Sequence, residues 1–212
     1  MFSVIFDMDG TLLDTQKVVI SAWDYAGENQ GIVGVGNEIP NVCGMNKIGW
    51  SNYLRNKFPK LDINSFIIDA GQYISENLVV KFMPGAEKLL KFLKKNNVKI
   101  ALASGSSLNS VMHHLNEVSA VEYFDAIVGG NEVINGKPAP DIFLLAAERL
   151  GVKPCECYVF EDSSNGIKAA YNAGMKPIGV PDIAKLDSET KKILFAEIGQ
   201  LDEAIAVFEK MI

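Results

Sequence analysis

Residues 5–15 of the chain read IFDMDGTLLDT, a stretch in which an apolar run leads into two aspartates and a glycine. Four apolar or small residues at positions 3–6 lead into it, and a short apolar run before a glycine predicts a buried strand. Asp7 directly follows that run, and ligand sites of open α/β sheets form at the carboxyl ends of their strands. We therefore expect Asp7 to belong to a functional site at this edge of a sheet.

Asp9 is expected to act together with Asp7. The two side chains would point to the same side if the strand geometry continued, because successive strand residues alternate between faces. Two carboxylates this close repel each other unless a cation compensates them, and an all-oxygen site suits Mg²⁺. A single Asp-x-Asp-Gly is also compatible with a solvated acidic turn in which Asp14 caps the following helix.

Composition limits the classes of protein to consider. With 212 residues and 48% hydrophobic content, the chain can bury one core, or one core and a small accessory lobe. A net charge of −6 argues against nucleic-acid binding, which requires basic groups to neutralise phosphates. No apolar segment reaches the length of a membrane span, no secretory signal is expected, and three cysteines predict no disulfide framework. We expect a cytoplasmic protein without a membrane partner, and a monomer.

The hydrophobic pattern changes along the chain. Residues 14–80 have helical spacing, interrupted by a glycine-rich turn at 31–36, and Met83-Pro84-Gly85 ends this segment. Strands and helices then alternate, which predicts a parallel, doubly wound α/β sheet. The expected strands after the first are 98–103, 126–128, 158–160 and 177–180, and the clearest later helices are 142–150, 167–173 and one near 201–208. The core is therefore expected to be discontinuous, with residues 1–13 and 81–212 in the sheet domain and 14–80 in a helical lobe.

Three further polar groups follow predicted strands. Ser104 begins a Ser-Gly-Ser-Ser stretch whose hydroxyl and backbone N–H groups could bind an anion. Lys137 lies in a loop stiffened by two prolines, and Glu161 and Asp162 end the fourth strand. Taken one at a time, each has a structural explanation: Ser104 as a helix cap, Lys137 as a solvated cation, and Asp162 or Ser163 as the cap of the next helix.

Taken in order, the acidic pair, the serine, the lysine and the second acidic pair resemble the four motifs of the haloacid dehalogenase-like superfamily. The segments at 137–141 (KPAPD) and 160–170 (FEDSSNGIKAA) are especially similar to the branch that contains β-phosphoglucomutase and small sugar-phosphate phosphatases. The resemblance implies a Rossmann-like core, and it places the helical segment 14–80 where that branch has a cap domain.

The resemblance also implies a mechanism, in which Asp7 is the nucleophile that forms an aspartyl phosphate and Asp9 is the general acid and base. Mg²⁺ would be held by Asp7, by Asp162 and by the main-chain carbonyl of Asp9, with Glu161 ligating it or holding a bound water. The residues expected to bind the substrate, a small phosphorylated metabolite, are Ser104, Gly105, Ser106, Lys137 and, from the cap, Lys47. His113 and His114 fall off the apolar stripe of their helix and are expected to face solvent.

Four positions favour a hydrolase over a phosphosugar mutase. By motif alignment, Val19 replaces a histidine of β-phosphoglucomutase, Lys47 replaces an arginine, Ser107 replaces a lysine, and Thr11 replaces an apolar residue. A mutase must grip both phosphate ends, and lysine lacks the bidentate fork of arginine. A magnesium-dependent phosphatase is therefore the leading hypothesis, and a β-phosphoglucomutase-type mutase is the alternative.

Three other classes fit less well. A haloalkanoate dehalogenase lacks the second aspartate, whereas Asp9 is present. A phosphoacceptor signalling domain would be much shorter and would have no helical insertion after its first strand. A catalytically silent binding protein would require a broken acidic cluster, and this one is intact.

Overall fold

Six parallel strands form one sheet in a computed structural model that describes residues 2–183 and 185–212. The strand order is β3-β2-β1-β4-β5-β6, with β1 in the centre between β2 and β4. The strands are β1 (Ser3–Phe6), β2 (Lys99–Ser104), β3 (Ala126–Gly129), β4 (Cys157–Glu161), β5 (Lys176–Gly179) and β6 (Ala196–Glu197). This order confirms the predicted doubly wound α/β sheet, whose ligand crevice lies where the chain changes direction beside β1.

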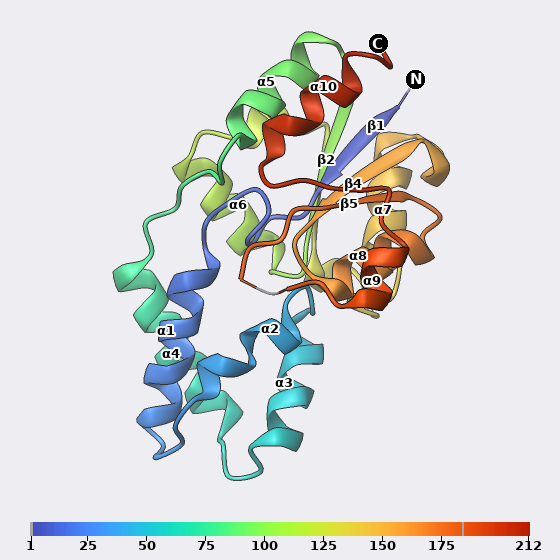
Figure 1. Cartoon of the computed structure of the whole chain (residues 1–212). Helices are drawn as coiled ribbons and strands as arrows, with labels where there is room; N and C mark the ends of the chain where they lie inside the picture. The colour runs from blue at the N-terminus through green and yellow to red at the C-terminus, as the bar shows by residue number, and fades with distance from the viewer. Residues whose placement is uncertain (1, 184) are drawn as a thin grey trace.

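Helices cover both faces of the sheet (Figure 1). Alternate residues of β1 enter two separate cores, since Phe6 packs on one face and Ile5 on the other. The first core contains α5 (Ala86–Lys95), α6 (Leu108–Glu117) and α10 (Ile205–Phe208), and the second contains α7 (Asp141–Leu150) and α8 (Ser164–Asn172). The outer helix α9 (Ser188–Lys192) follows β5.

Sequence and structure differ mainly at short elements. The two-residue strand β6 was not predicted, because two residues are too few to establish an alternating pattern. The helix expected near 201–208 is a 3₁₀ turn followed by the single turn α10. The 3₁₀ helices are η1 (Val35–Glu38), η2 (Val121–Tyr123), η3 (Gly130–Glu132), η4 (Pro154–Glu156) and η5 (Leu201–Ala204).

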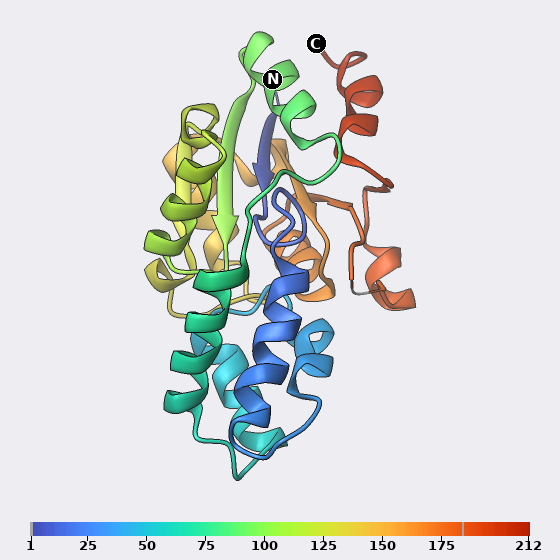
Figure 2. The same ribbon diagram turned by 90° about the vertical axis from the view of Figure 1, so that its left-hand side faces the viewer.

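A helical lobe follows β1, as the sequence predicted, and lies at the carboxyl end of the sheet (Figure 2). Its helices are α1 (Gln16–Glu28), α2 (Ile39–Val42), α3 (Lys47–Lys57) and α4 (Ile63–Asn77), and we refer to these four helices with their connecting loops as the cap. The cap has its own hydrophobic core, in which Trp23 packs between Trp50 and Phe66. In the described part of the chain, no helix combines the length and the apolar character needed to cross a bilayer.

The cap contacts the sheet domain through backbone pairing at their junction and through side-chain hydrogen bonds, among them those of Gln16 to Asp162 and of Asn165 to Cys43. The two chain segments that connect them pair with each other: Leu13 forms an antiparallel bridge with Phe82, and the Asp14 amide donates to the Lys81 carbonyl at 2.9 Å. Beyond this junction, the Asn165 side chain of α8 donates to the Cys43 carbonyl of the cap at 3.0 Å. The cap is therefore docked over the end of the sheet at which Asp7 lies.

Candidate active site

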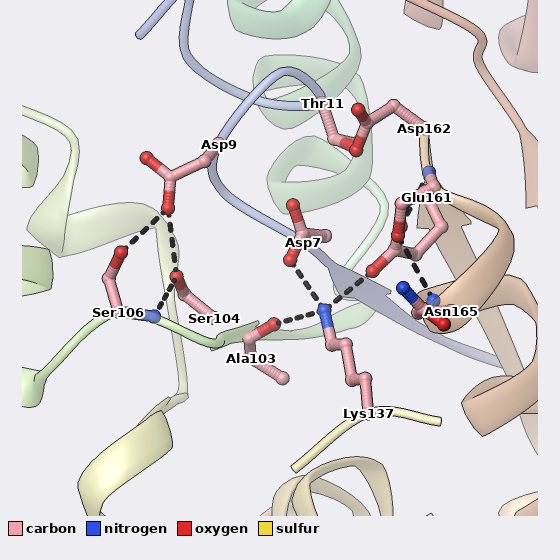
Figure 3. A network of polar contacts seen from close by, with 12 residues as sticks. Asp7, Asp9, Thr11, Ala103, Ser104, Ser106, Lys137, Glu161, Asp162 and Asn165 are labelled. Carbon is pink, nitrogen blue, oxygen red and sulfur yellow. Dashed lines mark hydrogen bonds and ion pairs between the residues drawn. The ribbon is translucent and has the colours of Figure 1, made fainter. Parts of the chain in front are cut away.

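The centre of the site is a buried ion-pair cluster that joins β1 and β4 (Figure 3). Lys137 donates to Asp7 Oδ1 and to Glu161 Oε1, each at 2.5 Å. The carboxylates follow neighbouring parallel strands, which explains why residues 154 positions apart along the chain meet one ammonium group. Lys137 is only 3% exposed, so the structural explanation of this residue as a solvated cation is wrong.

Glu161 and Asp162 are both buried and hydrogen-bonded. The second oxygen of Glu161 accepts from the Ser163 amide at 3.0 Å and from its hydroxyl at 2.9 Å. The Asp162 carboxylate accepts from the Thr11 hydroxyl at 3.2 Å and from the Gln16 amide at 2.7 Å. Ser163 also caps α8, so one residue stabilises both the helix and the site.

Asp9 does not share a strand face with Asp7. The strand β1 ends at Phe6, and Gly10 turns the chain with a φ of 82°, so the strand geometry on which the expected common direction depended does not continue to Asp9. The Asp9 carboxylate instead accepts hydrogen bonds from Ser106 at 2.8 Å and Ser104 at 3.2 Å (Figure 3). It also accepts one from Thr15 at 2.7 Å. Its environment of three hydroxyl groups differs from the ammonium contact of Asp7.

The serine segment after β2 supplies these contacts. The buried Ser104 hydroxyl donates to Asp9 and accepts from the Ser106 amide at 3.0 Å. Ser107, not Ser104, is the N-cap of α6, since its hydroxyl accepts from the Ser110 amide. Ser104 is therefore not explained by helix capping.

Burial and charge act against each other on these pKa values, and the net shift is upward for Asp7, Asp162 and Lys137 alike. Burial, partly offset by Lys137, raises the pKa of Asp7 well above its usual value. Burial and the neighbouring Glu161 raise the pKa of Asp162 from 3.8 to about 8. Burial alone would lower the pKa of Lys137, but the carboxylates of Asp7 and Glu161 outweigh this effect and raise it. When Asp7, Glu161 and Asp162 are all ionised, the cluster carries more negative charge than the ammonium group of Lys137 compensates.

The donor set fits a hard divalent cation. Asp7, Glu161 and Asp162 each present a carboxylate oxygen, and these three atoms lie within 4.8 Å of one another. Oxygen ligands and an excess of negative charge are the conditions that Mg²⁺ requires. The Gln16 amide donates both to the Asp9 carbonyl, at 2.8 Å, and to Asp162. Sequence reasoning missed Gln16, because no motif or periodicity distinguishes this single glutamine at the start of the cap.

A cavity of about 580 Å³ lies between the cap and the sheet domain, beside this cluster. Asp7, Asp9, Gly105 and Ser106 line it from the sheet domain, and Lys47 lines it from the cap. The structure thus brings five of the predicted site residues to one cavity.

The other predicted residues lie behind or beside this cavity. Ser104, Lys137, Glu161 and Asp162 are buried behind the lining. His114 also lines the cavity, so the expectation that it faces solvent is wrong. The cap covers the side of α6 that lies off the apolar stripe, and a helical pattern alone cannot reveal such a neighbour.

Comparisons with known proteins agree with this geometry. A family model described as haloacid dehalogenase-like hydrolase matches residues 3–174. A phosphorylated carbohydrates phosphatase of Thermotoga maritima is 33% identical over 184 residues, which cover 84% of this chain and 84% of that protein.

Two further relatives are mutases by name. A β-phosphoglucomutase of Bacillus subtilis is 31% identical over 194 residues, covering 85% of this chain and 83% of that protein. The crystal structure of a β-phosphoglucomutase from Clostridium difficile superposes with a TM-score of 0.82 at 26% identity, covering 99% of this chain and 96% of the other.

The family model covers most of the chain, and the Thermotoga maritima relative is a phosphatase by name. The chain therefore belongs to the haloacid dehalogenase-like hydrolase family, which confirms the resemblance of its four motifs and the expectation of a phosphatase enzyme.

Proposed function

We propose that this protein is a magnesium-dependent phosphatase that hydrolyses a small phosphorylated metabolite, a sugar phosphate or similar phosphomonoester, through an aspartyl-phosphate intermediate. The observation that carries the proposal is the position of Asp7. One of its oxygens is held by Lys137, while Oδ2 receives no hydrogen bond from the described residues, and the side chain lines the cavity. A carboxylate oriented through one oxygen and open at the other suits a nucleophile.

Asp9 supplies the proton transfers in this proposal. Asp7 attacks phosphorus, the bond to the leaving oxygen breaks, and the proton of Asp9 passes to that oxygen. Asp9 then accepts a proton from the water that hydrolyses the aspartyl phosphate, which releases Asp7 and phosphate. Ser104, Ser106 and Thr15 hold the Asp9 carboxylate in place for both transfers.

Lys137 and the acids around it complete the site. The Lys137 ammonium offsets part of the charge on the phosphoryl group and on Asp7. Asp7, Asp162 and the Asp9 carbonyl would hold Mg²⁺, with Glu161 beside them. When bound, the ion neutralises charge between the nucleophile and the phosphate.

The cap lining supports hydrolysis over mutase chemistry. Val19, Lys47 and Ser107 all line the cavity, and these are positions at which the chain departs from the mutase pattern. Lys47 is the one charged side chain that the described cap residues contribute to the lining. Thr11 donates to Asp162 and so supports the acidic cluster.

The first test is hydrolysis of p-nitrophenyl phosphate with and without Mg²⁺. We expect activity that requires the metal and that Asp7→Asn and Asp9→Asn each reduce by at least about 10³-fold, because each removes a group that acts on the reacting atoms. Asp69→Asn, which changes a carboxylate outside the cavity lining, is the matched control and should retain activity. Metal-independent turnover, or turnover that survives Asp7→Asn, would refute the proposal. Interconversion of β-glucose 1-phosphate and glucose 6-phosphate would instead favour the mutase.

A further inference from the structure

The cap side of the cavity is strongly apolar. Side chains from all four cap helices face it, among them Val19 of α1, Val42 of α2, Trp50 of α3, and Ile67 and Ile74 of α4. Trp23 also lines the cavity, and its ring lies 5.3 Å from that of Trp50. A cavity of about 580 Å³ is larger than a phosphate requires. The space beside the apolar wall is therefore available to the leaving group of the substrate.

The polar groups near this wall are largely occupied. Thr15 and Gln16 of the cap donate to Asp9 and Asp162, respectively. On the opposite wall, the hydroxyls of Ser107 and Ser110 lie 2.9 Å apart and bond to each other. A polyhydroxylated leaving group would therefore lose hydrogen bonds to water without replacing most of them, which is unfavourable.

Besides the indole N–H groups of the two tryptophans, two polar side chains of the described lining are left for recognition. Lys47 enters the cavity from the start of α3, and His114 from α6, where its Nδ1 has no hydrogen-bond partner among the described residues. Two such groups can orient one polar edge of a ligand, but they cannot satisfy the several hydroxyls of a hexose.

We infer that the leaving group of the substrate is a flat, predominantly apolar ring system with few hydroxyl groups, and not a polyhydroxylated sugar. This inference rests on the proposed phosphatase function, and among the phosphomonoesters named there it excludes the phosphates of polyhydroxylated sugars. The ring would pack against the apolar wall formed by Val19, Trp50, Ile67 and Ile74, while the phosphoryl group reaches Asp7.

The test compares two substrates with equally reactive leaving groups. Benzyl phosphate and glucose 6-phosphate are both esters of primary alcohols, so a difference in kcat/KM reports the fit of the leaving group and not its chemistry. We expect kcat/KM for benzyl phosphate to be higher by at least about tenfold. Both tryptophans of the chain line the cavity, so quenching of their fluorescence by benzylphosphonate, but not by methylphosphonate, would measure binding separately from turnover.

A pair of neighbouring isoleucines on α4 supplies the matched variants. Ile67 is half-buried and lines the cavity, whereas Ile68 is 68% exposed and does not. Ile67→Asn places an amide in the apolar wall and should lower kcat/KM for benzyl phosphate by about fivefold while raising that for glucose 6-phosphate. Ile68→Asn makes the same chemical change outside the cavity and should leave the ratio of the two values unchanged.

The outcomes separate this inference from the function on which it rests. Acetyl phosphate has a leaving group that is too small to reach most of the cap wall and that leaves without protonation, so its hydrolysis tests the attack by Asp7 and the breakdown of the aspartyl phosphate. No hydrolysis of acetyl phosphate or p-nitrophenyl phosphate would refute the proposed function. Hydrolysis of both, with glucose 6-phosphate equal to or better than benzyl phosphate, or with the same ratio in Ile67→Asn as in the parent, would overturn the inference and leave the function intact.

Discussion

At the scale of single residues, the site is governed by an imbalance of charge. Asp7, Glu161 and Asp162 are buried around one ammonium group, that of Lys137. Desolvation and mutual repulsion make ionisation of these acids unfavourable, and the raised pKa values of Asp7 and Asp162 express this effect. The metal-free protein should therefore become less stable as the acids ionise.

Asp162 offers a direct test of that instability. Its pKa in the folded protein, about 8, lies above the usual value of 3.8, so the folded state retains a proton that the unfolded state loses. The stabilising contribution is complete below pH 3.8 and is lost as the pH rises towards about 8. In EDTA, we expect Asp162→Asn to raise Tm relative to the parent by at least about 3 °C at about pH 8.5, and by much less at about pH 4. A Tm difference that is the same at both pH values would contradict this explanation.

Single residues also show what a sequence can reveal. Asp7, Lys137 and Asp162 were predictable because each follows a recognisable strand, and the carboxyl ends of parallel strands must converge. Gln16 and His114 were not, because their importance depends on which surface the cap covers. The direction of the Asp9 side chain could not be predicted from the alternation of strand residues either, because the chain turns at Gly10.

At the scale of elements, the first turn of α8 has little free space. Gly166 packs directly against the Glu161 carboxylate, so a Cβ at this position would overlap it. The same turn is capped by Ser163, whose hydroxyl also donates to Glu161. The start of the helix and the ion-pair cluster are thus one packed unit.

Gly166→Ala should disrupt that unit. The added methyl would displace Glu161 from Lys137, and we expect the free energy of unfolding to fall by about 3 kcal/mol or more. Gly71→Ala is the control, because Gly71 lies within α4 and its added Cβ would meet no atom within 4 Å. That variant should be more stable than the parent by about 0.5–1 kcal/mol, through helix propensity. Urea unfolding measures both, and equal effects of the two substitutions would refute the argument.

At the scale of the whole molecule, the cap and the sheet domain touch through closely approaching backbones. A Cβ on Gly105 would lie 2.7 Å from the Met45 carbonyl, and one on Gly44 would lie 2.6 Å from the Ser163 hydroxyl. Few side-chain hydrogen bonds cross this contact, and the one from Asn165 to the Cys43 carbonyl holds the loop before α3. A contact of this kind can open to admit substrate and close again.

Removing the Asn165 contact should shift the cap towards the open arrangement. A hydrogen bond contributes about 0.5–1.5 kcal/mol net, so Asn165→Ala should increase amide hydrogen exchange at residues 43–45 by about 2- to 12-fold. Asn172→Ala provides the control on the same helix, since Asn172 bonds to the Pro138 carbonyl within the sheet domain. Unchanged exchange in Asn165→Ala, or an equal increase in both variants, would contradict this account of docking.

The pairing of Leu13 with Phe82 has a consequence for how such proteins diversify. Because the chain leaves and re-enters the sheet domain at adjacent points, the part of the cap beyond Thr15 and Gln16, which bond to Asp9 and Asp162, can be lengthened, shortened or replaced without altering the register of β1 with its neighbours. Exchange of the gene segment that encodes this part of the cap would join a new substrate-binding surface to an unchanged phosphoryl-transfer site in a single event. The selection of a substrate and the reaction performed on it can therefore evolve independently.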